Sequence, residues 1–270
     1  MNLTISLAQM AFSFGEPEEN YQRVRKWVAN AEKVGTDILL FPELWASGYD
    51  LENCAAHAQA LDEGLFLRMS ALARQHSMIL GGSLLENHQG DIFNTFFLYG
   101  RDGEMMGYYR KVHLFGLLEE EKWLRAGDEL VLLDAPWGKT GLSICYDLRF
   151  PEMFRVYAAA GAKLILMVAE WPETRIEHWR MLLLSRAIEN QVYIAAVNKV
   201  GRSQGADLGG RSAIVDPWGE RVVEGGTEEA LLTAKIDLAL VDQVREKIPV
   251  LKDRQPDAYE NVREYNHDPR

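Results

Sequence analysis

One segment of the sequence limits the possible folds more than any other, because it joins a buried strand, a reactive side chain and a helix. Residues 139–152 predict a short buried strand that ends at Cys145, a polar turn, and a helix that begins at Pro151. A side chain at the carboxyl end of a strand, just before a helix, points into the crevice where open α/β folds bind ligands. A thiol held there can act as a nucleophile, although a free cysteine taken alone is more often a small buried hydrophobe.

The rest of the chain alternates short apolar strands with amphipathic helices. Strands are predicted at residues 4–8, 37–41, 77–85, 93–99, 105–109, 163–169, 192–197, 212–215, 221–224 and 230–236. Helices are predicted at 16–33, 61–76, 174–190 and 238–248, and a glycine-rich loop at 201–210. With no linker and no internal repeat, residues 1–270 are expected to form one α/β domain. The polar residues from about 250 onward are expected to form a tail at a subunit interface.

Composition excludes several classes of function. The formal net charge of −11 argues against nucleic acid or an anionic membrane as the main partner. The first ten residues lack a secretory signal, and no apolar run reaches the roughly 18 residues of a transmembrane helix. The only two cysteines, Cys54 and Cys145, make a disulfide framework implausible and fit a reducing cytoplasm. The histidines form no close pair and no Cys-x-x-Cys accompanies them, so no metal site is predicted.

Three charged or reactive residues directly follow apolar strands: Glu43, Lys111 and Cys145. Neighbouring strand ends would bring them into one crevice. Singly, such a glutamate or lysine is usually a solvated surface residue. Together they provide a nucleophile, a general base that can take the thiol proton, and an ammonium that can stabilise an oxyanion. These are the groups needed for acyl transfer through a thioester.

Other cysteine chemistries fit the sequence less well. A phosphatase loop needs Cys-x5-Arg, but Arg149 lies four residues after Cys145. A papain-like site needs a histidine partner, and nothing in the sequence singles one out. A thioredoxin-like site needs a second cysteine nearby, and Cys54 is distant in the chain.

The motifs around these three residues resemble those of the nitrilase superfamily of carbon–nitrogen hydrolases. Leu-Phe-Pro-Glu at 40–43 resembles the glutamate motif, Tyr-Arg-Lys-Val-His-Leu at 109–114 the lysine motif, and Cys-Tyr-Asp-Leu-Arg-Phe-Pro-Glu at 145–152 the cysteine motif. They occur in the order of the family, and residues 186–191 and 216–220 add support. The resemblance covers nearly the whole chain.

The resemblance implies a fold and a set of roles. The fold would be an α-β-β-α sandwich that forms a homodimer, or a higher homo-oligomer, through helices beside the active site. Cys145 would be the nucleophile, Glu43 the general base and Lys111 the oxyanion stabiliser, with the backbone N–H of Tyr146 completing the oxyanion hole. Such an enzyme acts on a small-molecule amide and needs no metal and no organic cofactor.

The resemblance also implies a second glutamate that orients the substrate amide and the lysine. Its spacing before the Ala-Gly-Asp at 126–128 selects Glu120. Because three glutamates are adjacent, Glu119 and Glu121 remain alternatives.

Further similarities are to the omega-amidase branch, whose members hydrolyse the terminal amide of 2-oxoglutaramate and 2-oxosuccinamate. The pocket is expected to involve Tyr49, Glu170, Trp171 and Arg175. Relatives commonly carry asparagine where Glu170 stands, and a negative charge there would weaken binding of an anionic substrate.

Alternatives to that substrate and that pocket stay open at this point. A substrate carboxylate could also be recognised by Arg149, Arg202 or Arg211. The alternative activities are those of an aliphatic amidase, an N-carbamoyl hydrolase and a nitrilase. The alternative outside catalysis is a nitrilase-like scaffold for protein interaction.

Overall fold

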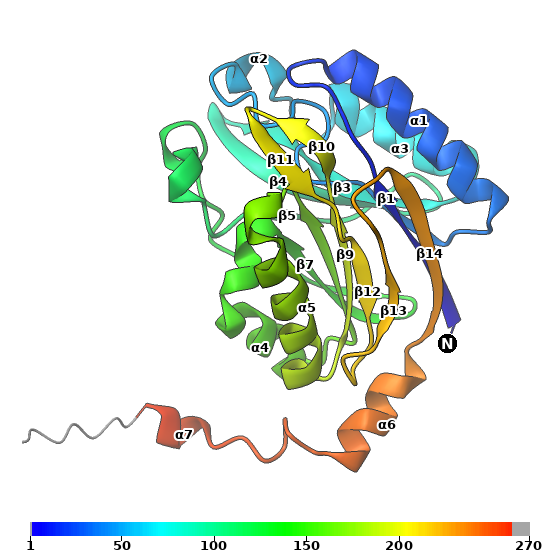
Figure 1. Cartoon of the computed structure of the whole chain (residues 1–270), viewed down its shortest axis with the longest axis vertical. Helices are drawn as coiled ribbons and strands as arrows, with labels where there is room; N and C mark the ends of the chain where they lie inside the picture. The colour runs from blue at the N-terminus through cyan, green and yellow to red at the C-terminus, as the bar shows by residue number, and fades with distance from the viewer. Residues whose placement is uncertain (1, 261–270) are drawn as a thin grey trace, which may run out of the picture.

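The computed structural model describes residues 2–260, which form two facing six-stranded sheets with helices on both outer sides (Figure 1). The first sheet has the order β14-β1-β2-β3-β4-β5. Its strands are β1 (Asn2–Gln9), β2 (Ile38–Leu40), β3 (Ile79–His88), β4 (Asp91–Tyr99), β5 (Met105–Arg110) and β14 (Ala230–Asp237). The second sheet has the order β13-β12-β9-β8-β7-β6. Its strands are β6 (Leu132–Ala135), β7 (Gly138–Ile144), β8 (Leu164–Ala169), β9 (Tyr193–Asn198), β12 (Ala213–Val215) and β13 (Arg221–Glu224).

The helices form the two outer layers of the sandwich. Helices α1 and α3 cover the first sheet, and α4 and α5 cover the second (Figure 1). The α-helices are α1 (Pro17–Lys33), α2 (Cys54–His57), α3 (Gly64–His76), α4 (Pro151–Ala159), α5 (Ile176–Asn190), α6 (Ala239–Lys247) and α7 (Pro256–Tyr259). Short 3-10 segments lie at Gly116–Leu118, Glu120–Lys122, Cys145–Arg149 and Glu173–Arg175.

Successive side chains of a strand pack into two different hydrophobic cores, one on each side of the sheet. In β4, Phe96 and Leu98 belong to the core between the two sheets, whereas Phe97 and Tyr99 belong to the core under α1 and α3. Successive side chains of a strand point to opposite faces, so one strand supplies both cores. Both faces of β8 are likewise covered, and all of its residues are buried. The expected α-β-β-α sandwich is therefore confirmed.

The topology places strand ends from the two sheets side by side. Strands β1, β2 and β3 are parallel in the first sheet, and β7, β8 and β9 are parallel in the second. The backbone N–H of Glu43, just after β2, donates to the carbonyl oxygen of Ala169 at the end of β8 (3.4 Å). The two sheets thus meet where their parallel strands end, and the crevice lies between sheets rather than along one.

The prediction of a loop at 201–210 was wrong. Strands β10 (Val200–Ser203) and β11 (Ala206–Gly209) form an antiparallel hairpin there. Its turn residues Gln204 and Gly205 both have positive φ, 45° and 82°. Two consecutive residues with positive φ form the tight turn whose twist matches that of the two paired strands. Gly205 therefore belongs to a hairpin turn and not to an open loop. The four-residue strand β6 and helix α2 also escaped prediction, because they are too short for a periodic pattern.

The end of the chain leaves the sandwich. After α6 the chain runs away from the two sheets to α7, and its residues are mostly exposed (Figure 1). The predicted contact of this tail with a partner subunit stays a prediction, and residues 261–270 lie outside the described part. Within residues 2–260, every helix is too short or too polar to cross a lipid bilayer.

Candidate active site

Cys145 stands at the point where strand β7 turns into a helical segment. It is the residue after β7 and the first of the 3-10 segment Cys145–Arg149. Its φ is +43°, in the left-handed region that residues with a side chain rarely adopt. Such backbone strain persists only where surrounding contacts hold it, and it is concentrated at functional sites. The strained turn presents the thiol to the cavity described below.

The side chain of Asp147 holds this turn in place. Its Oδ2 accepts hydrogen bonds from the backbone N–H of Ile144 (2.8 Å) and from the hydroxyl of Tyr109 (2.8 Å). Its Oδ1 lies 2.7 Å from Nδ1 of His113. Asp147 is completely buried, so these contacts replace its hydration. They tie the Cys145 turn to the segment that carries Lys111.

Glu43 is surrounded by hydrogen-bond donors. Its Oε1 accepts from the hydroxyl of Tyr49 (2.6 Å), from Nδ2 of Asn94 (2.8 Å) and from Nζ of Lys111 (2.9 Å). Its Oε2 accepts from the backbone N–H of Glu170 (3.1 Å). An ionised carboxylate accepts only, so four donors suit this form of the side chain. The contacts of Glu43 thus suit a carboxylate side chain that can accept a proton.

Lys111 bridges two buried carboxylates. Its Nζ lies 2.9 Å from Oε1 of Glu43 and 2.8 Å from Oε1 of Glu120, and all three side chains are fully buried. The Tyr49 hydroxyl also contacts Oε1 of Glu120 (2.9 Å). Of the three adjacent glutamates, Glu120 is the buried one; Glu119 and Glu121 are exposed. Of these three glutamates, Glu120 is therefore the one that contacts Lys111.

Burial and the neighbouring charges determine the protonation of the thiol. Burial raises the pKa of Cys145 well above its ordinary value, Glu43 raises it further, and the Lys111 ammonium opposes the rise. The resting cysteine is therefore a neutral thiol, and a base must take its proton when substrate arrives. Among the groups that act on this thiol, the Glu43 carboxylate is one that can accept a proton.

The same effects act on the two charged partners of Glu43. Burial alone would lower the pKa of Lys111, but Glu120 and Glu43 together raise it above its ordinary value. The lysine therefore stays an ammonium. Burial raises the pKa of Glu120, while Lys111 opposes the rise. Two buried carboxylates thus share one buried cation.

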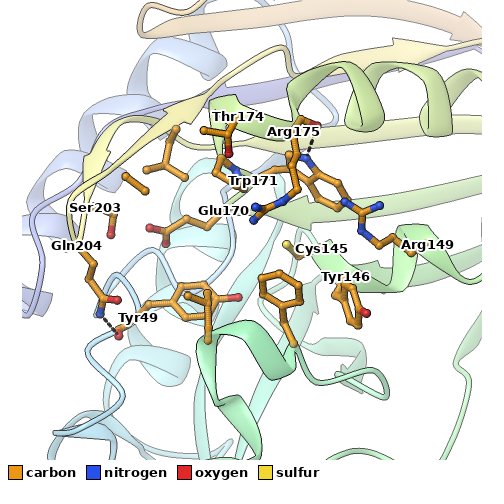
Figure 2. Close-up of a pocket in the computed structure, with 15 residues that line it drawn as sticks. Tyr49, Cys145, Tyr146, Arg149, Glu170, Trp171, Thr174, Arg175, Ser203 and Gln204 are labelled. Atoms are coloured by element: carbon orange, nitrogen blue, oxygen red, sulfur yellow. Dashed lines mark hydrogen bonds between the residues drawn. The ribbon is translucent and has the colours of Figure 1, made fainter.

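A cavity of about 200 Å³ opens in front of Cys145 (Figure 2). Pockets for drug-sized ligands usually measure about 300–1,000 Å³, so this cavity suits a smaller molecule. The lining residues come from both sheets and from the β10–β11 hairpin. They are Tyr49, Phe115, Leu118, Cys145, Tyr146, Arg149, Glu170, Trp171, Pro172, Thr174, Arg175, Ser203, Gln204, Ala206 and Leu208.

Two arginines give the cavity wall a positive charge. The Arg149 guanidinium lies 4.7 Å from the ring centre of Trp171, and that of Arg175 lies 5.6 Å from the ring centre of Phe115. Within residues 2–260, neither forms a salt bridge with an acidic side chain, although the Arg149 guanidinium lies 3.4 Å from Nδ1 of His178. A guanidinium held against an aromatic face is well suited to bind a carboxylate.

Glu170 lines the cavity as expected, but its charge has a partner. Its Oε1 lies 3.0 Å from Nζ of Lys199, and both side chains are buried. The Lys199 ammonium also lies 3.9 Å from the ring centre of Phe12. Because the ion pair carries no net charge, Glu170 is a weaker obstacle to an anionic substrate than the sequence alone suggests.

The structure sorts the residues that the sequence singled out. Tyr49, Glu170, Trp171 and Arg175 all line the cavity, and Tyr49 also contacts the buried carboxylates. Of the other three arginines considered for carboxylate binding, Arg149 lines the cavity, whereas Arg202 and Arg211 do not.

Sequence reasoning missed three residues that support the site. Asn94 is a polar group inside the mostly buried strand β4, Tyr109 lies near the end of β5, and Asp147 lies three residues after β7 ends. Each is fully buried, and buried polar groups need partners. For Asn94, its position within the apolar run of β4 was the available signal.

The tyrosine that was expected to complete the oxyanion hole also lines the cavity. The N–H of Tyr146 lies in the first turn of a helical segment, where backbone donors have no partner within the helix. It can therefore donate to an oxygen in the cavity. No group of three or more histidine, cysteine, aspartate or glutamate side chains in the described part of the chain could hold a metal ion.

Comparison with known proteins agrees with the geometry. The family model for carbon–nitrogen hydrolases matches residues 4–246. A 2-oxoglutaramate amidase of Bacillus subtilis (strain 168) is 38% identical over 96% of this chain and 100% of the relative. Omega-amidase NIT2 of Mus musculus is 34% identical over 89% of this chain and 91% of the relative.

A solved structure is similar over nearly the same range. It is an amidase of Nesterenkonia sp. AN1 in which the acetamide moiety of fluoroacetamide is covalently added at the active site cysteine. The two structures agree with a TM-score of 0.84 and 28% identity over 96% of this chain and 95% of that chain.

Proposed function

The chain belongs to the carbon–nitrogen hydrolase family and hydrolyses carbon–nitrogen bonds, and from this premise we propose an omega-amidase. Its substrate is the terminal amide of a small dicarboxylic acid, of the 2-oxoglutaramate or 2-oxosuccinamate type. The observation that carries the proposal is that Arg149 and Arg175 line the cavity with Cys145 and form no salt bridge within residues 2–260. They leave room for a substrate carboxylate beside the nucleophile.

The proposed reaction has two halves. Glu43 takes the proton of Cys145, and the thiolate sulfur attacks the amide carbonyl carbon. Lys111 and the N–H of Tyr146 hold the resulting oxyanion. Glu43 returns the proton to the amide nitrogen, which leaves as ammonia. Glu43 then deprotonates a water molecule that attacks the thioester, the carboxylic acid leaves, and the thiol regains its proton. Glu120 positions Lys111 through its 2.8 Å contact.

The other candidate functions explain the two cavity arginines and the buried charged groups less well. A neutral aliphatic amide makes no use of two arginines, and nothing in the cavity specifically selects an N-carbamoyl group or a nitrile. An interaction scaffold gains nothing from three buried charged groups behind a thiol, because burying charge is costly unless it serves a purpose. Amide hydrolysis, in contrast, gives a function to each of the buried side chains Glu43, Lys111 and Glu120.

Replacing either Arg149 or Arg175 with glutamine tests the carboxylate site. We expect kcat/KM for 2-oxoglutaramate to fall roughly 10- to 100-fold, because a charge-assisted hydrogen bond contributes about 1.5–3 kcal/mol. Turnover of propionamide should change far less. The matched control is Arg202→Gln, which removes an exposed arginine outside the cavity lining. An equal loss on both amides would contradict the carboxylate role.

We further propose that the enzyme forms a homodimer, or a higher homo-oligomer, through α4 and α5. Val156 on α4 is 53% exposed, and Met181 and Ile188 on α5 are 64% and 52% exposed. Exposed apolar side chains that gather on neighbouring helices are typical of an interface. The exposed segment after α6 is available to extend this contact.

Replacing Met181 with glutamate tests the interface. Because the substitution would bury a charge between subunits, we expect the sedimentation coefficient to fall toward the monomer value at micromolar concentration. The exposed Leu67→Glu on α3 is the control. A wild-type protein that sediments as a monomer would contradict the proposal.

A cytoplasmic location is also proposed. Both cysteines are free in the structure, and a reactive thiol is stable in a reducing compartment. Recovery of the native enzyme only from a secreted or periplasmic fraction would contradict it.

A further inference from the structure

The hydroxyl of Tyr49 contacts all three buried charged groups behind the nucleophile. Its oxygen lies 2.6 Å from Oε1 of Glu43, 2.9 Å from Oε1 of Glu120 and 3.3 Å from Nζ of Lys111. Figure 2 shows this hydroxyl on the side of the tyrosine ring that is nearer to Cys145. Glu43, Glu120 and Lys111 are completely buried, so their polar atoms must be satisfied by one another and by neighbouring donors.

One hydroxyl hydrogen is too few for the two carboxylate contacts of Tyr49. An ammonium only donates hydrogen bonds, so Lys111 donates to the tyrosine oxygen. The tyrosine donates its single hydrogen to one of the two glutamates, and an ionised carboxylate has no hydrogen for the other contact. If both glutamates were ionised, one short contact would join two oxygen atoms with no hydrogen between them. One glutamate must therefore carry a proton.

The contacts indicate which glutamate carries it. The 2.6 Å contact with Glu43 has the length of a hydrogen bond from a hydroxyl to an ionised carboxylate, and the 2.9 Å contact with Glu120 suits two neutral groups. Glu43 also accepts from three further donors. Within residues 2–260, Glu120 accepts instead from Lys111 and from the backbone N–H of Phe115. Burial also raises the pKa of Glu120.

We propose that Glu120 is protonated in the resting enzyme, and that Tyr49 is the positioning residue that keeps this proton on Glu120 and leaves Glu43 ionised. The Glu120 carboxyl donates to the tyrosine oxygen, and the tyrosine hydroxyl donates to Glu43. The inference deepens the proposed function and rests on it, because it takes Glu43 as the base of that reaction.

A neutral Glu120 also helps Cys145 to lose its proton. With Glu120 protonated, the Lys111 ammonium is balanced by Glu43 alone. When Glu43 takes the thiol proton, the negative charge moves to the sulfur, and Lys111 then balances the thiolate. An ionised Glu120 would compete for the same ammonium and leave a net negative charge among buried groups, which is unfavourable. The proton on Glu120 therefore favours the thiolate that attacks the amide.

Tyr49→Phe tests the role of the hydroxyl, because it removes that group and keeps the ring. Without the hydroxyl, the state with one proton on the two glutamates loses two hydrogen bonds, so a second proton binds at higher pH. We expect the acidic limb of the pH profile of kcat/KM for 2-oxoglutaramate to move up by about one pH unit or more. The other titratable groups that face the two glutamates are the same in both enzymes. They are Lys111, Cys145 and the ion pair of Glu170 with Lys199.

The matched control is Tyr99→Phe, which removes another buried tyrosine hydroxyl. That hydroxyl donates to the carbonyl oxygen of Leu61 (3.4 Å), and Tyr99 does not line the cavity. The control should leave the acidic limb where it is in the wild type. A purely structural effect of losing a buried hydroxyl would lower stability or kcat in either variant without moving that limb.

Infrared spectroscopy detects the proton on Glu120 without any change at Tyr49, so the test does not depend on Tyr49→Phe being folded. At about pH 8, exposed aspartates and glutamates are ionised. The difference spectrum between the wild type and Glu120→Gln should therefore contain the carbonyl band of a protonated carboxyl group, which shifts in heavy water. The spectra are recorded on the resting enzyme without substrate.

Either measurement can overturn the inference. A difference spectrum with carboxylate bands alone would show that Glu120 is ionised. An acidic limb that Tyr49→Phe leaves unmoved would show that the hydroxyl does not control the proton. In both cases the wild type still hydrolyses 2-oxoglutaramate, and the proposed function stands. A wild type that does not hydrolyse 2-oxoglutaramate would refute the proposed function, whatever the infrared spectrum shows.

Discussion

Replacing Cys145 with alanine is expected to abolish ammonia release from every amide substrate while leaving the fold intact. The thiol is the only nucleophilic side chain proposed for the reaction, and loss of a catalytic nucleophile can lower kcat by roughly 10⁵-fold or more. The fold should survive, because Cys145 is a small side chain that is 8% exposed at the cavity wall. Ammonia release and the thermal unfolding midpoint are measured on the same preparation.

The second cysteine provides a matched control. Cys54 is also free and buried, and its thiol lies 3.9 Å from the carbonyl oxygen of Trp123. It does not line the cavity. Cys54→Ala should therefore retain activity. Full activity in Cys145→Ala would refute the thioester mechanism, and loss of activity in both variants with lowered unfolding midpoints would indicate a defect in folding instead.

The second large effect is expected from Glu43→Gln. The substitution preserves the size of the side chain but removes its ability to take a proton. General base catalysis typically contributes about 10²- to 10⁴-fold, so kcat should fall by that amount. The four donors around Glu43 make the glutamine a poor replacement, since its NH₂ group must face at least one of them.

Glu120→Gln is the informative comparison, because Glu120 contacts the same lysine at nearly the same distance as Glu43. A positioning residue keeps part of its function as an amide, since the Gln oxygen can still accept from Lys111. We expect about a tenfold loss in kcat, well below that of Glu43→Gln. If Glu120→Gln loses as much as Glu43→Gln or more, the assignment of Glu43 as the base is wrong.

The pattern of apolar residues in the sequence predicts most of the secondary structure. The same pattern also identifies three of the buried site residues. Apolar runs that stop at Glu43, Lys111 and Cys145 are visible without a structure, because a charged or reactive residue after a buried strand interrupts the pattern. Periodicity does not reveal that Glu43 and Lys111 belong to one sheet and Cys145 to the other. Local patterns say which residues are buried, but the pairing of sheets depends on contacts between distant segments.

Contacts between segments distant in the chain also explain why the supporting residues of the site were not predicted. Asn94 donates to Glu43 across 51 positions in the chain, and Tyr109 donates to Asp147 across 38. The ion pair between Glu170 and Lys199 likewise spans 29 positions. Each contact forms only when strand ends meet, so the sequence shows a polar residue in an apolar context without showing its partner. The β10–β11 hairpin was missed for a different reason: its glycine-rich composition is shared by tight turns and open loops.

The most direct test of the proposed amidase activity is ammonia release from four substrates: 2-oxoglutaramate, propionamide, an N-carbamoyl amino acid and a simple nitrile. Wild-type enzyme is measured beside Cys145→Ala. We expect fast, cysteine-dependent turnover of 2-oxoglutaramate and slow turnover of the other three. Preference for propionamide would keep the thioester mechanism and refute the carboxylate site at Arg149 and Arg175. Turnover of 2-oxoglutaramate that persists undiminished in Cys145→Ala would contradict the central claim that this cysteine carries the hydrolysis.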